Sequence, residues 1–391
     1  MDDDTDRPGA SELGRLLRHY QGERATGIGF PTATDIDYSE LAPFFGLRLN
    51  NVGDPWVDPV NPDHAKELER EVVDFLANLF RAPRDDRWGY ITSGGTEGNL
   101  YGLYTARALY PDGIVYHSAA AHYSVTKCAD LLALPEITVA ADRFGEIDYD
   151  DLHAAVSEHR GRPAIVVANV GTTLSEAVDD VGRIGDVLRA ARAHGHYIHA
   201  DAALSGVPLA LLAGRPGFDL ADGADSISVS GHKFLGTPMP CGVVLTRRSL
   251  MDWIDRPVSY TGCPDTTVTG SRSGHAALLL WYAIRSYGSR GLGERARRAR
   301  QLARYALRRL DALNWDAWRH PHAFTVMLRT PPPSVATRWA LASTDGWSHI
   351  ICMPGVTRER IDRFLDDLQA AVPEPQPFGD AAFTVARCSS S

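Results

Sequence analysis

The chain has 391 residues, 44% of them hydrophobic and 23% charged, which is the composition of a globular protein large enough for two or three domains. Its net charge of -9 argues against a general nucleic-acid or anionic-membrane surface, although a local pocket can still bind a small anion. With no secretory leader, no apolar run of membrane-spanning length and five scattered cysteines without a CxxC pair, we expect a cytoplasmic protein without a disulfide framework.

Residues 1–49 are predicted to form an N-terminal arm. One short helix is expected in the first 20 or so residues. The stretch that follows is rich in glycine, proline and aromatic residues, as in "GIGFPTATDIDYSELAPFFG", and is expected to be ordered. An arm of this kind needs another surface to pack against.

Residues 50–260 are predicted to form a large α/β domain. Asn61 and Pro62 suit the start of a helix, and apolar residues follow at helical spacing. Beyond them, short apolar runs alternate with amphipathic helices, the pattern of a mostly parallel sheet covered on both faces. The predicted strands are 88–92, 113–118, 164–171, 196–203, 226–230 and 242–248, and the predicted helices are 97–109, 181–193 and one from 124.

Residues 261–391 are predicted to form a smaller α+β domain, with strands at 324–330 and 348–354 and a closing helix from 357. An arginine-rich helix over 294–313 could suggest a nucleic-acid face. Its leucines and alanines form an apolar stripe, however, so we interpret it as a solvated amphipathic helix.

Ligands of open α/β sheets bind at the carboxyl ends of strands, and a glycine-rich turn lies at one such end. Ser93 to Thr96 stand between a predicted strand and a predicted helix, where close backbone approach and free helix N–H groups suit a phosphate. The turn matches neither GxGxxG nor GxxxxGK[ST], which disfavours a dinucleotide or Walker-type site. A plain glycine-rich turn is the alternative.

Two further polar residues follow predicted strands. His122 comes after three alanines, which leave room for a flat ring against the imidazole, although a structural histidine is the alternative. Asp201 ends an apolar strand and, if buried, needs a cationic or hydrogen-bonding partner. A zinc site could be suggested by three nearby histidines: His194, His196 and His199. Their placement in a loop and inside a strand argues against a metal site.

Lys233 stands in "SISVSGHKFLGTPMPCG", among small and apolar residues. A lysine with an ordinary pKa near 10.4 is a poor nucleophile at neutral pH, and burial beside His232 and a cofactor can lower that pKa enough for imine chemistry. Alternatively, its stem packs and its amine reaches solvent. An anion cradle, a stacking platform, a carboxylate and a lysine together match one ligand, pyridoxal 5'-phosphate (PLP).

From about Gly27 to Leu368, the chain resembles the group II PLP-dependent amino-acid decarboxylases, in the branch that holds bacterial histidine decarboxylases and plant serine decarboxylases. The resemblance rests on segments such as "NNVGDPW", "WGYITSGGTEGN", "HYSVTK", "NVGTTLSEAVDD", "HADAALSG", "SVSGHKFLGTPMPCG" and "TVTGSRSGHAALLLWYAI". It implies a fold-type I, aspartate aminotransferase-like architecture and a homodimer with active sites at the interface. From the net charge, the absence of a long apolar run and the placement of the histidines, we expect no metal, no nucleic acid and no membrane.

The resemblance also implies roles for individual residues. Lys233 would form the internal aldimine, Asp201 would pair with the pyridine nitrogen, and His122 would stack on the ring opposite Ala203. The phosphate would be held by four residues: Gly95, Thr96, Ser230 and His232. Two residues of "TGSRSG" would reach the neighbouring subunit's site: Gly270 and Ser271.

Decarboxylation would then proceed from an aldimine through a quinonoid to the amine, with Asp201 keeping the ring nitrogen protonated. The residue that returns a proton to the α-carbon is left open between His122, His232 and Tyr260. The expected substrate is a polar L-amino acid, with a slight lean to serine over histidine from "SHIICMPGVTRERIDRF". A decarboxylation-dependent oxidative deaminase, a less favoured aminotransferase and a noncatalytic dimeric homologue are the alternatives.

Overall fold

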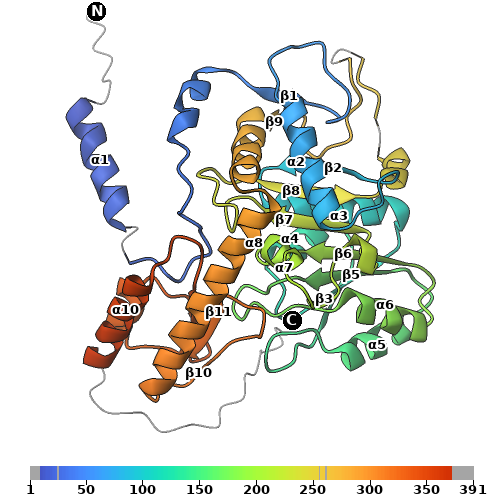
Figure 1. Cartoon of the computed structure of the whole chain (residues 1–391). Helices are drawn as coiled ribbons and strands as arrows, with labels where there is room; N and C mark the ends of the chain where they lie inside the picture. Colours follow the sequence, from blue (N-terminus) through green and yellow to red (C-terminus); the bar gives the residue numbers. More distant parts are fainter. Residues whose placement is uncertain (1–8, 24–25, 255, 260–261, 372–391) are drawn as a thin grey trace, which may run out of the picture.

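The computed structural model describes residues 9–23, 26–254, 256–259 and 262–371, and its centre is a seven-stranded sheet (Figure 1). The strand order is β2-β8-β7-β6-β5-β3-β4. All neighbouring pairs are parallel except β2–β8 and β7–β8, so the prediction of a mostly parallel sheet is confirmed. The strands are β2 (Trp88–Thr92), β3 (Ile114–Ser118), β4 (Glu136–Val139), β5 (Ala164–Asn169), β6 (His196–Asp201), β7 (Ser226–Ser230) and β8 (Gly242–Thr246).

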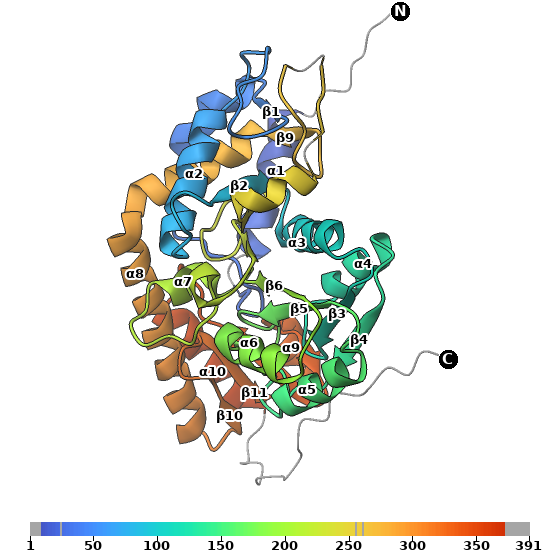
Figure 2. The ribbon, with the colours of Figure 1, turned by 90° about the vertical axis from the view of Figure 1, so that its right-hand side faces the viewer.

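Helices cover both faces of this sheet. In β5, Ile165 and Val167 pack in one apolar cluster with α3 and α4, whereas Val166 packs in another with α5 and α6. Figure 2 shows these two pairs of helices on opposite sides of the sheet. Burial on both faces explains why the strands are continuous apolar runs. The helices are α2 (Lys66–Leu79), α3 (Gly95–Leu109), α4 (Ser124–Leu131), α5 (Tyr149–Glu158), α6 (Val181–Ala190) and α7 (Gly206–Ala210).

Helix α2 begins at Lys66, so the expectation that it starts at Asn61 and Pro62 was wrong. The Asn61 side chain instead accepts a hydrogen bond from the Asp63 N–H at 3.1 Å within a loop. The Lys66 ammonium is fully buried and donates to the carbonyl oxygens of Asp54 and Val57 at 2.7 and 2.6 Å. A buried lysine with backbone acceptors therefore fixes the start of the helix.

A second, four-stranded antiparallel sheet lies toward the C-terminus, in the order β10-β11-β13-β12. Its strands are β10 (Ala317–Trp318), β11 (Thr325–Arg329), β12 (Ser343–Thr344) and β13 (Trp347–Ile351). The helices of this part are α9 (Pro333–Arg338) and α10 (Arg358–Ala371). A short pair, β1 (Asn50–Val52) with β9 (Ser271–Ser273), crosses the predicted boundary at residue 260. The division into 1–49, 50–260 and 261–391 remains a prediction.

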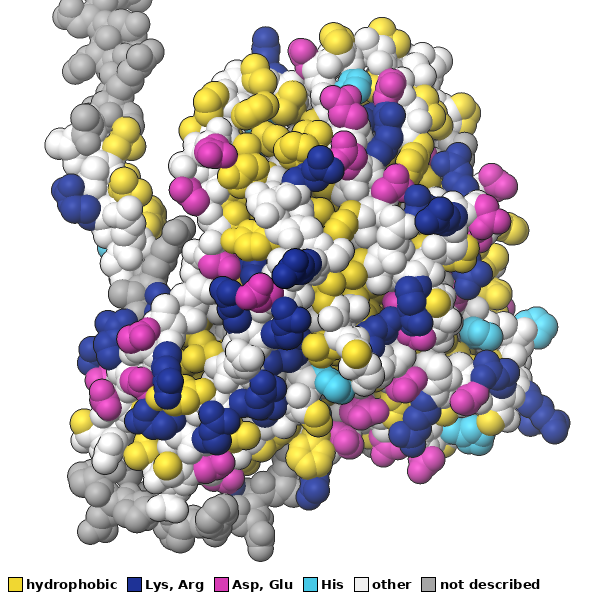
Figure 3. Space-filling model, viewed as in Figure 1, with side chains coloured by type: hydrophobic (Ala, Val, Ile, Leu, Met, Phe, Trp, Pro, Cys, Tyr) yellow, Lys and Arg dark blue, Asp and Glu magenta, His cyan; other side chains and the backbone are white. Residues whose placement is uncertain are grey.

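Helix α8 (Gly274–Ala312) links the two sheets and is longer than the predicted arginine-rich helix. It bends at Gly288, whose φ of 56° and ψ of -177° suit glycine. Two of its arginines are buried, which corrects the expectation that this helix is simply solvated. Arg295 pairs with Asp35, and Arg300 donates to the carbonyl oxygen of Pro208 at 3.1 Å. Other arginines of α8 and α10 are exposed, and blue side chains are numerous over these two helices in Figure 3.

The arm expected at the N-terminus packs against its own chain. After α1 (Ala10–Glu23), it runs between the two sheets and ends in a 3₁₀ helix, η1 (Ser39–Gly46). The N–H of Ala33 donates to the carbonyl oxygen of Lys233 at 3.1 Å, and the N–H of Ile351 donates to that of Ile28 at 2.7 Å. The arm thus connects the loop that carries Lys233 to the smaller sheet. Among the described residues, no helix is both long and apolar enough to cross a membrane.

Helix α3 lies unusually close to β6 and β7 because small residues face those strands. A Cβ atom at Gly98 would lie 2.6 Å from the Ser228 Cβ, and one at Gly102 would overlap the His199 ring. The two glycines lie four residues apart on one face of the helix, so the backbone itself forms the contact surface.

This close approach predicts opposite effects for two glycine substitutions. Gly102→Ala should lower the free energy of unfolding by about 1–3 kcal/mol, because the added methyl overpacks the His199 ring. Gly185→Ala is the matched control in α6, where a Cβ would meet only the tip of Arg189, and it should raise stability by up to about 1 kcal/mol. Urea unfolding of both variants checks the difference, and equal changes would contradict the packing argument.

Candidate active site

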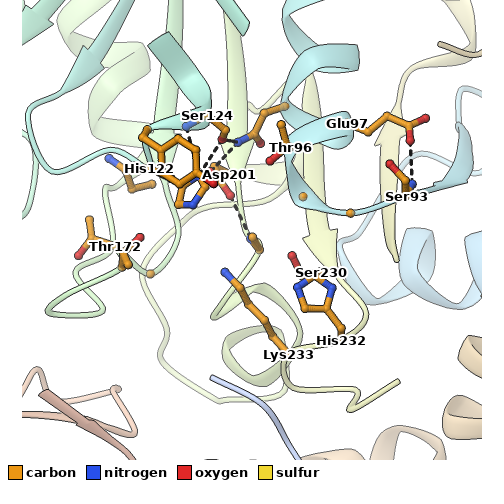
Figure 4. Close-up of a pocket in the computed structure, with 18 residues that line it drawn as sticks. Ser93, Thr96, Glu97, His122, Ser124, Thr172, Asp201, Ser230, His232 and Lys233 are labelled. Atoms are coloured by element: carbon orange, nitrogen blue, oxygen red, sulfur yellow. Dashed lines mark hydrogen bonds between the residues drawn. The ribbon is translucent and has the colours of Figure 1, made fainter. Parts of the chain in front are cut away.

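Five strand ends converge on one cavity. Strands β2, β3, β5, β6 and β7 all run in the same direction, so their carboxyl ends share one edge of the sheet. A cavity of about 310 Å³ lies at this edge, and side chains from the loops after these strands enter it (Figure 4). Its wall includes eight of the eleven residues predicted for the site: Gly95, Thr96, His122, Asp201, Ala203, Ser230, His232 and Lys233.

Two predicted residues that the structure describes do not line this cavity. Gly270 and Ser271 are exposed at the start of β9, where Ser271 accepts a hydrogen bond from the Asn50 side chain at 3.2 Å. Their proposed role toward a neighbouring subunit remains a prediction. Tyr260 lies outside the described residues.

The N-terminus of α3 forms one wall of the cavity. Its first N–H groups have no partner within the helix, and they belong to the turn that the sequence marks as an anion site. Gly95 is required here because a Cβ would lie 2.9 Å from the Ser230 hydroxyl. The Glu97 carboxylate accepts hydrogen bonds from the Ser93 N–H at 2.7 Å and the Tyr90 hydroxyl at 3.0 Å. These donors stabilise the negative charge of Glu97 beside the turn.

The Asp201 carboxylate lies at the end of β6 and is only 7% exposed. One oxygen accepts a hydrogen bond from the Asn99 side-chain NH2 at 2.8 Å, and the other accepts from the Ala203 N–H at 3.2 Å. These donors stabilise the carboxylate, and the side chain still lines the cavity. A positively charged group in the cavity would complete its surroundings.

His122 and His232 are held in opposite tautomers. His122 Nδ1 faces the Ser124 hydroxyl at 2.8 Å and the Ser124 N–H at 3.2 Å, so it accepts and Nε2 carries the proton. His232 Nδ1 donates to the Cys241 carbonyl oxygen at 3.1 Å, so its Nε2 is unprotonated when the ring is neutral. Burial lowers the pKa of both imidazoles, and neighbouring Lys233 lowers them further, against an opposing effect of Asp201 on His122.

Lys233 projects into the cavity toward Asp201 and His122 (Figure 4). The two residues after it, Phe234 and Leu235, are buried and anchor the loop from below. This anchoring explains why a lysine stands among apolar residues. Burial lowers the pKa of the Lys233 amine, and the nearby Asp201 carboxylate partly opposes that shift. A lower pKa increases the fraction of neutral, nucleophilic amine at physiological pH.

Sequence reasoning missed several cavity residues, namely Asn99, Ser124, Asn169 and Thr172. Asn99 lies inside α3 and ends the segment "WGYITSGGTEGN", on which the resemblance rests, but that segment was interpreted only for its glycine-rich turn. His199 is buried and hydrogen-bonded within the protein, and no metal-binding group of three or more ligands occurs in the part of the chain that the structure describes.

Comparison with known proteins identifies the family of this chain. Residues 50–315 match the pyridoxal-dependent decarboxylase conserved domain, and the chain belongs to this family. It is similar to histidine decarboxylase of Mesorhizobium japonicum, with 44% identity over 91% of this chain and 96% of the relative. It is also similar to serine decarboxylase 2 of Oryza sativa subsp. japonica, with 40% identity over 90% of this chain and 76% of the relative.

Among solved structures, L-methionine decarboxylase from Streptomyces sp. 590 in complex with L-methionine methyl ester superposes with a TM-score of 0.87. The two chains are 26% identical, and the match covers 95% of each. The fold is therefore that of fold-type I PLP enzymes, and the protein is a PLP-dependent amino-acid decarboxylase. The cavity fits this cofactor, because it contains a lysine, a buried carboxylate, an imidazole and the N-terminus of a helix.

The depressed pKa of Lys233 predicts how apoprotein stability depends on pH. The folded chain releases the lysine proton at a lower pH than the unfolded chain, so burial of the ammonium destabilises the fold at low pH and this loss disappears as pH rises toward 10.5. Lys233→Met should therefore stabilise the apoprotein at pH 6–7, with a gain that shrinks at higher pH.

Urea unfolding of both apoproteins at one protein concentration checks this prediction. Exposed Lys127 supplies the control, and Lys127→Met should show no such pH-dependent difference. A gain from Lys233→Met that stays constant with pH would show that its amine is solvated.

Proposed function

We propose that this enzyme decarboxylates a polar L-amino acid, histidine or serine, to the corresponding amine and CO2. The main support is the convergence of Lys233, Asp201 and His122 on one cavity at the carboxyl edge of the sheet. Relatives named for histidine occur more often than those named for serine, whereas the "SHIICMPG" segment resembles the serine members. The identities to the two kinds, 44% and 40%, are too close to separate them.

Bound PLP supplies an electron sink for the pair of electrons left when the carboxylate departs as CO2. In our proposal Lys233 holds the cofactor covalently. The negative charge of the Asp201 carboxylate keeps the ring nitrogen protonated. His122 and Ala203 cover the two ring faces. The phosphate is held by the N-terminus of α3 with two polar side chains, Ser230 and His232.

The tautomers favour His122 over His232 as the residue that returns a proton to the substrate carbon. Both imidazoles have lowered pKa values and are neutral at pH 7. In that state His122 carries a proton on Nε2, the nitrogen turned away from Ser124, whereas His232 Nε2 has none to give. We therefore assign the proton to His122 Nε2.

We also propose that two copies of the chain form the working enzyme. Two apolar surfaces on the described residues support this. The first is a stripe at helical spacing on α1, and the second lies on and just after η1, in the part of the molecule where Figure 3 shows hydrophobic side chains gathered. Their exposed members are Leu13, Leu16, Leu17 and Tyr20 on α1, and Phe44, Phe45 and Leu47 near η1.

The proposed dimer is tested by light scattering. The holoenzyme should give twice the mass of one chain.

The cofactor assignment is tested with Lys233→Ala. The wild type incubated with PLP should keep an absorption band near the visible edge after dialysis, whereas the variant should lose it and fall on the order of a thousandfold in kcat. The chain has three lysines, so borohydride reduction and peptide mass analysis can assign the site, with Lys127→Ala as the control that keeps both properties. A wild type that stays colourless would contradict the proposal.

The substrate is tested by assaying CO2 release from each of the twenty L-amino acids. Histidine or serine should give the highest kcat/KM, with one molecule of amine formed per CO2. Equal formation of aldehyde and hydrogen peroxide would instead identify an oxidative reaction. A clear preference for a large apolar amino acid would contradict the proposed substrate class.

A further inference from the structure

Behind the Asp201 carboxylate, buried polar side chains form a continuous hydrogen-bonded chain across three elements. The Ser226 hydroxyl lies 2.7 Å from His199 Nδ1, and His199 Nε2 lies 3.1 Å from the side-chain oxygen of Asn99 (Oδ1). The Asn99 NH2 group then donates to Asp201 at 2.8 Å. All four residues are at most 7% exposed, so water does not replace these partners.

The orientation of the Asn99 amide is determined by its neighbours. Its oxygen accepts from the Ser228 hydroxyl at 2.8 Å and from His199 Nε2. Rotating the amide by 180° would place its NH2 group against these two donors and its oxygen against the Asp201 carboxylate. The contact with Asp201 would be repulsive because an ionised carboxylate can only accept, so this contact determines the orientation.

His199 is suited to hold this orientation because it stays neutral. Burial lowers its pKa to about 4, against an opposing effect of Asp201, so at physiological pH the ring carries one proton. That proton lies on Nε2, because Nε2 faces the acceptor oxygen of Asn99 and Nδ1 faces a hydroxyl that can donate. The ring does not line the cavity, and it packs against Gly102.

The same amide also acts on His122, through the hydroxyl group of Ser124. The Asn99 NH2 group donates to the Ser124 hydroxyl at 3.0 Å, and this directs the hydroxyl proton toward His122 Nδ1. Asn99 is therefore a branch point between Asp201 and His122. Its two donated hydrogen bonds stabilise the charge of one residue and the tautomer of the other.

We propose that Asn99 and His199 are positioning residues that keep Asp201 as the charged partner of the cofactor ring nitrogen and keep the proton of His122 on Nε2. This inference rests on the proposed roles of Asp201 and His122. It adds a common cause for both roles, because one buried chain of hydrogen bonds stabilises the Asp201 charge and the proton on His122 Nε2.

The first test replaces Asn99 with leucine, which has a similar volume and no polar atoms. The loss of one hydrogen bond to a buried carboxylate should lower kcat roughly 10- to 100-fold with little change in KM. In protein reconstituted with PLP labelled by ¹⁵N in the ring, the nitrogen resonance should move from the protonated toward the unprotonated position.

The second test separates the relay from packing at position 199. His199→Phe fills the space beside Gly102 without a donor, and it should shift the ¹⁵N resonance in the same direction as Asn99→Leu. His199→Gln keeps an NH2 group that can reach the Asn99 oxygen, so it should restore most of the wild-type resonance. A ¹⁵N spectrum of the His122 ring should show mixed tautomers in Asn99→Leu and in His199→Phe, but not in His199→Gln.

Thr105→Val is the matched control, because it removes a buried hydrogen bond within α3, to the Tyr101 carbonyl oxygen, that takes no part in the relay. It should leave both spectra unchanged. If His199→Phe does not fold, Ser228→Ala provides the same readout with a smaller expected shift. Wild-type spectra in both Asn99→Leu and Ser228→Ala would overturn the inference, whereas a wild type without bound PLP would overturn the proposed function itself.

Discussion

The active site depends on burying one carboxylate without leaving it unpaired. An ionised side chain in a protein interior is destabilising by several kcal/mol unless charges or hydrogen-bond donors compensate it. Asp201 satisfies this condition with the Asn99 amide and the Ala203 N–H, and it keeps its face to the cavity. The electron-withdrawing role proposed for the cofactor ring requires this negative charge. The proposed reaction therefore depends on the hydrogen-bond donors around Asp201.

The Asn99 amide can reach Asp201 only because α3 packs closely on the sheet. Gly98 and Gly102 remove the side chains that would otherwise separate the helix from β6 and β7. The same helix presents its N-terminus to the cavity one turn earlier. A single element thus provides both the anion-binding end and the amide that stabilises the carboxylate, and its distance from the sheet sets the geometry of both.

Three basic groups that line the cavity, Lys233, His122 and His232, have complementary properties. Burial lowers the pKa of Lys233, His122 and His232, which favours their neutral forms near pH 7. A neutral lysine is nucleophilic, and the two neutral imidazoles differ in which nitrogen carries the proton. The arm from residue 26 onward adds a mechanical constraint, because Ala33 bonds to the backbone of Lys233 and the neighbouring segment bonds to the smaller sheet.

Much of this protein could be predicted from local sequence signals. Apolar runs bounded by glycine and polar residues identified strands such as 88–92 and 226–230 with their observed limits, because burial on both faces demands such runs. Lys233, Asp201, His122 and Gly95 could be found because each follows a strand, and parallel strands bring their carboxyl ends to one edge. The substrate was not determined by these signals.

Other features depend on contacts between residues far apart in the chain, and only the tertiary structure decided them. Asn99 and His199 are separated by 100 positions in the sequence, and nothing near either residue indicates that their side chains meet. The start of α2 at Lys66 follows from carbonyl groups of a preceding loop, and Arg295 is buried because the N-terminal arm brings Asp35 to it. Hydrogen bonds between buried polar groups require matched distance and direction in three dimensions, and a one-dimensional pattern does not contain that information.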